Sequence, residues 1–203
     1  PPPPPPRTIT GRLPAWRKHR LYLERLTLVL DHRGALKGEA ERLLCEGRDL
    51  RIGVIGHHYN VYDTFTTMSL LERLGAMGVD VMTADMVPEK LRERELKRLP
   101  KDIYWSYEQE VAGAILACSR HRLVDGIIFM ISFPCGPDSM VRVLCEQENR
   151  LMGGVPMLTL VMDEHTGEGG LLTRIEAFVD MLWRRKMRET EKPLAEEMEA
   201  VAV

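Results

Sequence analysis

The sequence lacks long apolar runs and any opening segment in which basic residues lead into an apolar stretch. Apolar runs such as residues 126–133 are far shorter than the roughly 20 residues that a membrane-spanning helix requires. A secretory leader would combine a basic start with an apolar stretch, and none is visible. We therefore expect no membrane partner and predict a cytoplasmic location.

The sequence also lacks an excess of charge of one sign. Its 28 lysines and arginines against 30 aspartates and glutamates give a formal net charge of -2. Basic residues alternate with acidic ones, so the continuous cationic face that binds a phosphate backbone is missing. We therefore expect no nucleic-acid partner.

Closely spaced cysteine pairs are missing as well. The 4 cysteines are Cys45, Cys118, Cys135 and Cys145, and none forms a CxxC pair. This spacing argues against a disulfide framework and against a self-contained zinc site. We expect reduced thiols.

What is present fits one ordinary domain, since 203 residues with 44% hydrophobic content suffice for a core. Composition divides the chain into four segments. They are a proline-rich linker or tag (residues 1–12), an N-terminal helical segment (13–48), a parallel α/β domain (51–186) and a charged tail (187–203).

Apolar strands alternate with amphipathic helices through the α/β domain. Strands are expected at 51–56, 79–83, 125–133 and 155–162, and helices at 66–77, 107–120, 137–153 and after residue 170. Such alternation implies right-handed crossovers and a parallel sheet. We predict a flavodoxin-like or Rossmann-like three-layer α/β domain with a four-stranded sheet in the order 2-1-3-4 and extra N-terminal helices. The charged insertion at 88–100 is interpreted as a lid or an edge helix.

Polar loops follow the first, third and fourth predicted strands, at residues 57–63, 134–139 and 163–170. Ligands of open parallel sheets bind beyond the carboxyl ends of the strands, where the following helices present their positive ends. We therefore expect the three loops to converge on one edge of the sheet and to form the functional site.

Cys135 is the strongest candidate for a functional residue in these loops, because it follows a buried strand and precedes a helix. The helix dipole there would favour thiolate over thiol, so Cys135 could bind iron or act as a nucleophile. The alternative is a small buried residue in a tight turn. Cys118 and Cys145 lie at helical spacing from apolar residues and are interpreted as core.

The loop at 163–170 offers Glu164 and His165 as candidate catalytic residues. His165 could act as a metal ligand, as a general base or as an anion contact. Alternatively, Asp163 and Thr166 merely cap the turn into the last helix.

Further side chains are candidates for binding a cofactor or another polar ligand. His57, Tyr59 and Asn60 follow the first strand, although Asn60 and Asp63 could equally cap a helix. The remaining candidates are Asp138 and Ser139 in the Cys135 loop and Arg174, which could contact an anion. Residues 104–107, which include Tyr104 and Trp105, could stack on a ring, but packing against the core is the favoured interpretation.

Four sequence phrases, in order, resemble iron-sulfur proteins related to 2-hydroxyacyl-CoA dehydratase, including the uncharacterised domain of CoA-substrate-specific enzyme activases. They are IGVIGHHYNVYD (52–63), IYWSYEQE (103–110), FPCGPDS (133–139) and DEHTGEGGLLTRIEAFVDML (163–182). The last phrase is long and is specific evidence for the resemblance, whereas GHHYN alone would be weak evidence.

This resemblance implies an α/β domain of a [4Fe-4S] protein from anaerobic metabolism, with Cys135 as a cluster ligand. A partner would be an ATP-dependent activase that delivers low-potential electrons. Because such a cluster usually takes about four cysteines and the predicted edge offers one, the other ligands would come from outside this chain. A cysteine-bearing partner region or subunit, or a homodimer, could supply them.

Three functions follow, in order of preference. The first is a component of a dehydratase or activase-like iron-sulfur system, with Cys135 as a cluster ligand. The second is a non-catalytic regulatory domain that binds a nucleotide, CoA or a partner protein without a cluster. The third is a hydrolase or transferase with Cys135 as nucleophile and His165 as base.

Overall fold

The computed structural model describes residues 50–201, with side chains described up to residue 189. The predicted linker at 1–12, the helical segment at 13–48 and Cys45 lie outside the described residues. The chain divides into one unit that ends at Asp163 and a second that starts at Glu164.

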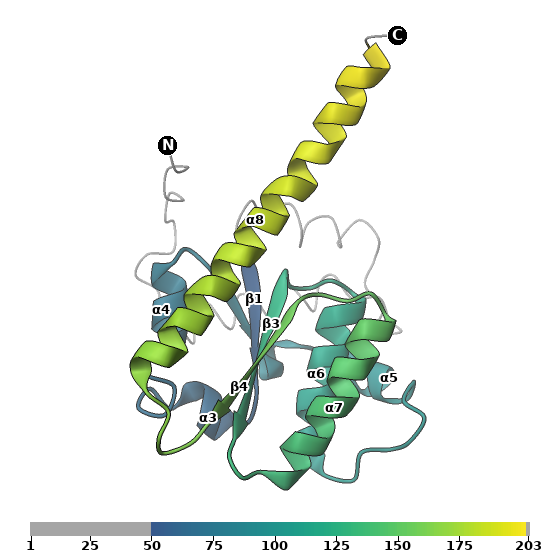
Figure 1. The fold of residues 1–203 in the computed structure, drawn as a ribbon. Helices are drawn as coiled ribbons and strands as arrows, with labels where there is room; N and C mark the ends of the chain where they lie inside the picture. The colour runs from purple at the N-terminus through teal and green to yellow at the C-terminus, as the bar shows by residue number, and fades with distance from the viewer. Residues whose placement is uncertain (1–49, 202–203) are drawn as a thin grey trace. The chain divides into compact units, whose positions relative to one another are not determined.

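Strands and helices alternate through the first unit (Figure 1). Its strands are β1 (Arg51–Ile55), β2 (Asp80–Thr83), β3 (Gly126–Ser132) and β4 (Met157–Met162). Its helices are α3 (His58–Tyr62), α4 (Leu70–Ala76), the 3-10 helix η1 (Ala84–Met86), α5 (Glu89–Leu96), α6 (Ser106–Arg120) and α7 (Gly136–Leu151).

The four strands form one sheet in the order β2-β1-β3-β4, and every pair is parallel. The predicted strand order and parallel sheet are therefore confirmed. In the centre of the sheet, Gly53 of β1 lies opposite Ile127 of β3, and Ile127 lies opposite Met157 of β4. β3 is buried over nearly its whole length, as its unbroken apolar sequence predicts.

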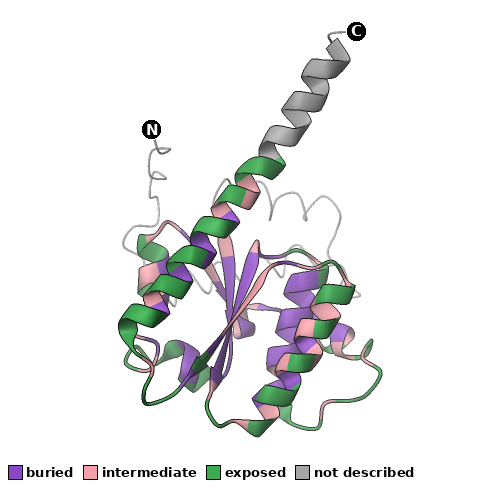
Figure 2. Cartoon of the chain, in the orientation of Figure 1, coloured by how far each residue is buried: buried purple, intermediate pink, exposed green. Residues whose placement is uncertain are grey.

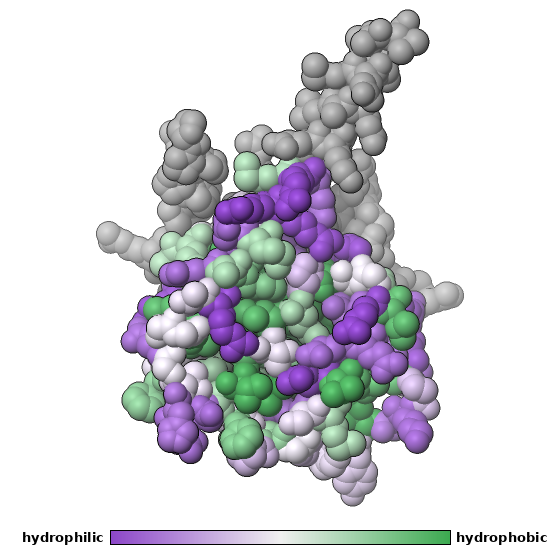
Figure 3. All heavy atoms as spheres, viewed as in Figure 1, coloured by the Kyte–Doolittle hydropathy of each residue, from purple (hydrophilic) through white to green (hydrophobic). Residues whose placement is uncertain are grey.

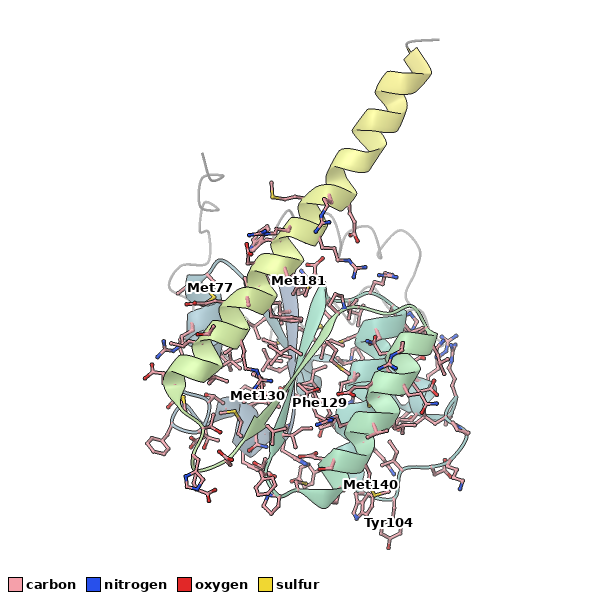
Figure 4. The ribbon with its side chains drawn as sticks, viewed as in Figure 1. Met77, Tyr104, Phe129, Met130, Met140 and Met181 are labelled. Atoms are coloured by element: carbon pink, nitrogen blue, oxygen red, sulfur yellow. The ribbon has the colours of Figure 1, made fainter. Side chains whose placement is uncertain are left out.

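The sheet of the first unit is covered on both faces, with α5, α6 and α7 on one side and α3 and α4 on the other (Figure 1). Neighbouring strand residues point to opposite faces. Phe129 therefore lies on the side of α6 and α7, and Met130 lies on the opposite side (Figure 4). Buried residues run along the strands and through α6 (Figure 2).

Helix α6 is buried on nearly all sides because it contacts α5, α7 and β1. Small residues on α6 permit these close approaches. A Cβ atom at Gly113 would lie 2.8 Å from the Cβ of Arg92 on α5. The charged insertion at 88–100 contains α5, which packs on α6 through the fully buried Leu91. This packing favours an edge helix over a lid.

The helix predicted at 66–77 begins later in the structure. Met68 and Ser69 adopt left-handed backbone conformations, with φ of 50° and 56°, which a continuous α-helix excludes. A short helix, α3, precedes this break, and α4 follows it. Periodicity alone did not reveal the break, because Met68 keeps the apolar spacing.

The second unit contains α8 (Glu168–Val201). Its buried apolar residues recur at helical spacing and are Leu171, Ile175, Phe178, Val179 and Leu182. The helix continues through residue 201, so most of the predicted charged tail is helical. Within the part of the chain that the structure describes, no helix has the length and apolarity needed to cross a membrane. On the face that Figure 3 shows, the described residues mix hydrophilic and hydrophobic side chains without one continuous surface of either kind.

Candidate functional site

The loops that follow β1 and β3 lie together at the carboxyl ends of these adjacent strands. His57 precedes α3 and Cys135 precedes α7, each in extended backbone conformation. The hydroxyl of Ser132 donates a hydrogen bond of 2.6 Å to the side-chain oxygen of Asn60 and ties the two loops together. Asn60 is 1% exposed within α3, so its side chain joins this helix to the end of β3 rather than capping a helix.

Four possible metal-binding side chains converge between these loops: His57, Glu108, Cys135 and Asp138. We call them the strand-end quartet. One ligand atom from each lies within 4.8 Å of every other. His57 Nε2 lies 3.0 Å from Asp138 Oδ1 and 3.6 Å from Glu108 Oε1. The quartet therefore combines one nitrogen, one sulfur and two carboxylates.

The quartet is largely shielded from solvent. Asp138 is 0% exposed, His57 and Glu108 are each 5% exposed, and Cys135 is partly buried. Neither carboxylate oxygen of Asp138 has a hydrogen-bond partner of good geometry among the described residues. Buried carboxylates without such partners are costly, so this arrangement favours a bound proton or cation.

The pKa values of the quartet reflect this crowding of acidic groups. Burial raises the pKa of Asp138, as does the nearby charge of Glu108, although His57 and the neighbouring Cys135 act in the opposite direction. Burial, Asp138 and Glu108 likewise raise the pKa of the Cys135 thiol. The start of the helix favours the thiolate as predicted, because the backbone amide of Asp138 lowers the pKa of Cys135, but burial and the two carboxylates outweigh this effect.

Aromatic rings flank the quartet. Tyr59 stacks on His57 with ring centroids 5.2 Å apart, and Tyr107 contacts His57 edge-on at 5.5 Å. Burial raises the pKa of Tyr59, as do the neighbouring Asp138, Cys135 and Glu108. Both tyrosine side chains also reach solvent, since Tyr59 is 61% and Tyr107 is 60% exposed.

The preceding aromatics, Tyr104 and Trp105, do not pack into the core as favoured from sequence. Tyr104 is 88% exposed and Trp105 is 40% exposed, and the two rings meet edge-on. Tyr104 lies at the same end of the first unit as Met140 near the start of α7 (Figure 4). The prediction that these rings pack against the core is therefore wrong, and stacking on a ligand stays a prediction.

Two predicted polar residues have local structural roles. The Ser139 hydroxyl donates a hydrogen bond of 2.9 Å to the carbonyl oxygen of Cys135, which fixes the first turn of α7. Asp63 Oδ1 accepts a hydrogen bond of 2.6 Å from the amide of Thr66, and this contact lowers the pKa of Asp63. Asp63 therefore caps the turn at 63–66 and not the start of a helix, because α4 begins only at Leu70.

Glu164, His165 and Arg174 belong to the second unit. His165 Nε2 lies 3.6 Å from Glu164 Oε1, and both side chains are exposed. Arg174 is exposed on α8. The convergence of this loop with the strand-end quartet stays a prediction.

Sequence reasoning missed Glu108. It follows a helix start rather than a strand, so the search along strand-end loops did not single it out. The signal was topological: a helix that leads into a parallel strand begins at the carboxyl edge of the sheet. The first turn of α6, which precedes β3, therefore lies beside the quartet's other members.

The described cysteines can supply one ligand of an iron-sulfur cluster, but they cannot supply all the ligands that such a cluster needs. Cys118 and Cys145 are both 0% exposed within the apolar core, as predicted. Burial raises the pKa of each thiol to about 12. Among the described residues, Cys135 alone places a thiol at the strand ends, whereas a [4Fe-4S] cluster usually takes about four thiolates.

An open parallel sheet with nitrogen, oxygen and sulfur donors at its strand ends defines a doubly wound α/β protein with a candidate metal site. The chain belongs to the family described as 2-hydroxyglutaryl-CoA dehydratase, D-component, whose model matches residues 17–182. Comparison with curated proteins found no match. Comparison with solved structures found none either.

Proposed function

We propose that the chain is a component of a 2-hydroxyacyl-CoA dehydratase type of iron-sulfur system. In this proposal, Cys135 supplies one thiolate to a [4Fe-4S] cluster, and the other ligands come from outside the described residues. A cysteine-bearing partner region or subunit, or a second copy of the chain, would supply them. An ATP-dependent activase would deliver electrons to the assembled cluster.

The observation that carries the proposal is the position of Cys135 in a chain of this family. The family model spans most of the chain, and Cys135 lies at the carboxyl end of the central strand β3. This is the edge at which parallel sheets bind ligands. The buried Cys118 and Cys145 cannot reach a cluster without opening the core.

The surrounding polar and aromatic groups would line an adjacent ligand site. His57 and Tyr59 lie against each other at the edge of the first unit, and Asn60 fixes their loop to β3. Asp138 and Ser139 hold the start of α7 beside Cys135. Separately, within the second unit, Glu164 and His165 are proposed as acid-base residues and Arg174 as an anion contact.

The test is the iron and acid-labile sulfide content of anaerobically purified and reconstituted chain, read with the visible spectrum. Cys135→Ala is compared with Cys145→Ala, which removes a core cysteine instead. We expect iron and sulfide in the wild type and in Cys145→Ala, and loss of both in Cys135→Ala. Circular dichroism checks that each variant is folded.

Two outcomes would contradict the proposal. A cluster that persists in folded Cys135→Ala would remove Cys135 from the ligand set. Folded wild-type protein that takes up no iron with sulfide would leave the cluster function without support in this chain. The second candidate function would then come first.

That second candidate is a non-catalytic domain that binds a nucleotide or CoA. The exposed rings of Tyr59, Tyr104 and Tyr107 favour it, because aromatic faces stack on an adenine ring. Thermal stabilisation by CoA in iron-free protein, lost in Tyr59→Ala, would support it. The cysteine-nucleophile function fits less well, because the pKa of Cys135 is raised and the imidazole beside it belongs to His57 rather than His165.

A further inference from the structure

We infer that the strand-end quartet is by itself a binding site for one divalent transition-metal ion of the zinc or ferrous type. This inference does not rest on the proposed function. It concerns the donors that the described chain already brings together, and it needs neither sulfide nor ligands from a partner.

The first support is the spacing of the donor atoms. Zinc binds nitrogen, oxygen and sulfur at about 2.0–2.3 Å in tetrahedral sites, so neighbouring ligand atoms lie roughly 3.3–3.8 Å apart. In the quartet, His57 Nε2 is 3.0 Å and 3.6 Å from the two carboxylates, and all four donors lie within 4.8 Å of one another. A contraction of about 1 Å at the widest pair would complete a tetrahedron.

The second support is the unsatisfied charge. Asp138 is 0% exposed, and neither of its carboxylate oxygens has a hydrogen-bond partner of good geometry among the described residues. The ion pairs of Asp138 and Glu108 within the described chain are both with His57. Two buried carboxylates beside one imidazole and a thiol form an environment that a divalent cation would neutralise.

The third support is the chemistry of the donor set. Magnesium and calcium prefer all-oxygen sites, whereas imidazole and thiolate select zinc, cobalt or ferrous iron. His57 supplies the nitrogen and Cys135 the sulfur, and the two carboxylates complete the set. The aromatic rings of Tyr59 and Tyr107 on either side of His57 would hold the imidazole in place.

The chain offers matched controls one and two residues away. His58 adjoins His57 and Glu110 follows Glu108, yet these two lie 3.7 Å from each other and outside the quartet. His58→Ala and Glu110→Gln therefore change the same residue types without removing a donor.

The test uses tag-free full-length chain stripped of metal with a chelator and titrated with zinc in a calorimeter. Cobalt then replaces zinc as a spectroscopic probe. We expect one zinc ion per chain, tetrahedral cobalt bands and a thiolate-to-cobalt charge-transfer band. His57→Ala, Glu108→Gln and Asp138→Asn should each weaken zinc binding by roughly tenfold or more, and Cys135→Ser should abolish the charge-transfer band. His58→Ala and Glu110→Gln should bind zinc as the wild type does.

Asp138→Asn keeps the shape of the side chain and Cys135→Ser keeps its size, so the test does not depend on the bulkier change at His57. Failure of the folded wild type to bind zinc would overturn the inference, and so would binding that survives the quartet variants. Metal uptake that requires both iron and sulfide would overturn it while leaving the proposed function standing. Zinc binding without any cluster formation would support the inference and contradict the proposed function.

Discussion

At the scale of single residues, the acidic groups crowded around Cys135 determine how readily its thiol ionises. A helix amino terminus alone would lower the pKa of a thiol. Here burial and the carboxylates of Asp138 and Glu108 outweigh that effect and raise the pKa. Local sequence could place Cys135 before a helix, but it could not reveal Glu108, which is 27 positions away along the chain.

The raised pKa predicts that Cys135 of metal-free folded chain reacts slowly with iodoacetamide at neutral pH, because less thiolate is present. We expect a lower rate than that of the same cysteine in the urea-unfolded chain. Mass spectrometry of the peptide that contains Cys135 measures both rates. Alkylation that is faster in the folded chain would contradict this electrostatic description and would revive the nucleophile function.

A second residue-scale prediction concerns Asp138→Asn in the absence of metal. Burial raises the pKa of Asp138, so the ionised form is disfavoured in the folded chain and costs stability at neutral pH. Removing this charge should raise stability by about 1 kcal/mol, or about 2–4 °C in melting temperature. Calorimetry of chelator-treated protein checks the sign.

Asp102→Asn serves as the control for this change, since it makes the same substitution at an exposed carboxylate in a loop. A lower melting temperature in metal-free Asp138→Asn than in the wild type would mean that the carboxylate is stabilising without a cation. A residue that destabilises the metal-free protein and strengthens the binding of a metal ion is typical of a functional site.

At the scale of secondary-structure elements, the buried carboxylate of Glu95 joins α5 to α6. It accepts a hydrogen bond of 2.6 Å from Arg120 Nε and lies 3.1 Å from His121 Nε2, with Arg98 at 3.6 Å. Burial raises the pKa of Glu95, but His121, Arg98 and Arg120 together outweigh it and lower the pKa. This network holds α5 against the helix that positions Glu108.

Glu95→Gln should therefore destabilise the fold by about 2–3 kcal/mol, somewhat below the usual cost of breaking a buried pair because its partners reach solvent. Because the folded pKa of Glu95 is lowered, its contribution is present above the unfolded pKa of about 4.3. That contribution is lost as the pH falls through the folded pKa. Urea unfolding at pH 7 and at acidic pH measures both effects.

The exposed Glu93 on the same helix provides the control variant, Glu93→Gln, which should change stability little. Equal stability losses in the two variants, or a loss in Glu95→Gln that does not shrink as the pH falls, would show that the network does not hold α5. The sequence predicted an edge helix or a lid at this place, but only the packed structure shows Glu95 buried on α6.

At the scale of the whole molecule, the order of strands and the parallel sheet followed from the alternation of apolar runs and amphipathic helices. The same topology gathers strand-end loops at one edge, which is why His57 and Cys135 meet although 78 positions separate them. Side-chain distances within that edge were beyond sequence reasoning, because they depend on packing. Stacking of Tyr59 on His57 and the Ser132 contact to Asn60 are examples.

The family match and the strand-end position of Cys135 together make one central claim, namely that the chain contributes a thiolate to an iron-sulfur cluster. Mössbauer spectroscopy of chain reconstituted anaerobically with labelled iron and sulfide tests it most directly, since it separates cluster iron from a single ferrous ion. The account predicts cluster iron in the wild type and in Cys145→Ala, and its loss in Cys135→Ala. A spectrum of single ferrous ions alone, or cluster iron that is unchanged in Cys135→Ala, would contradict it.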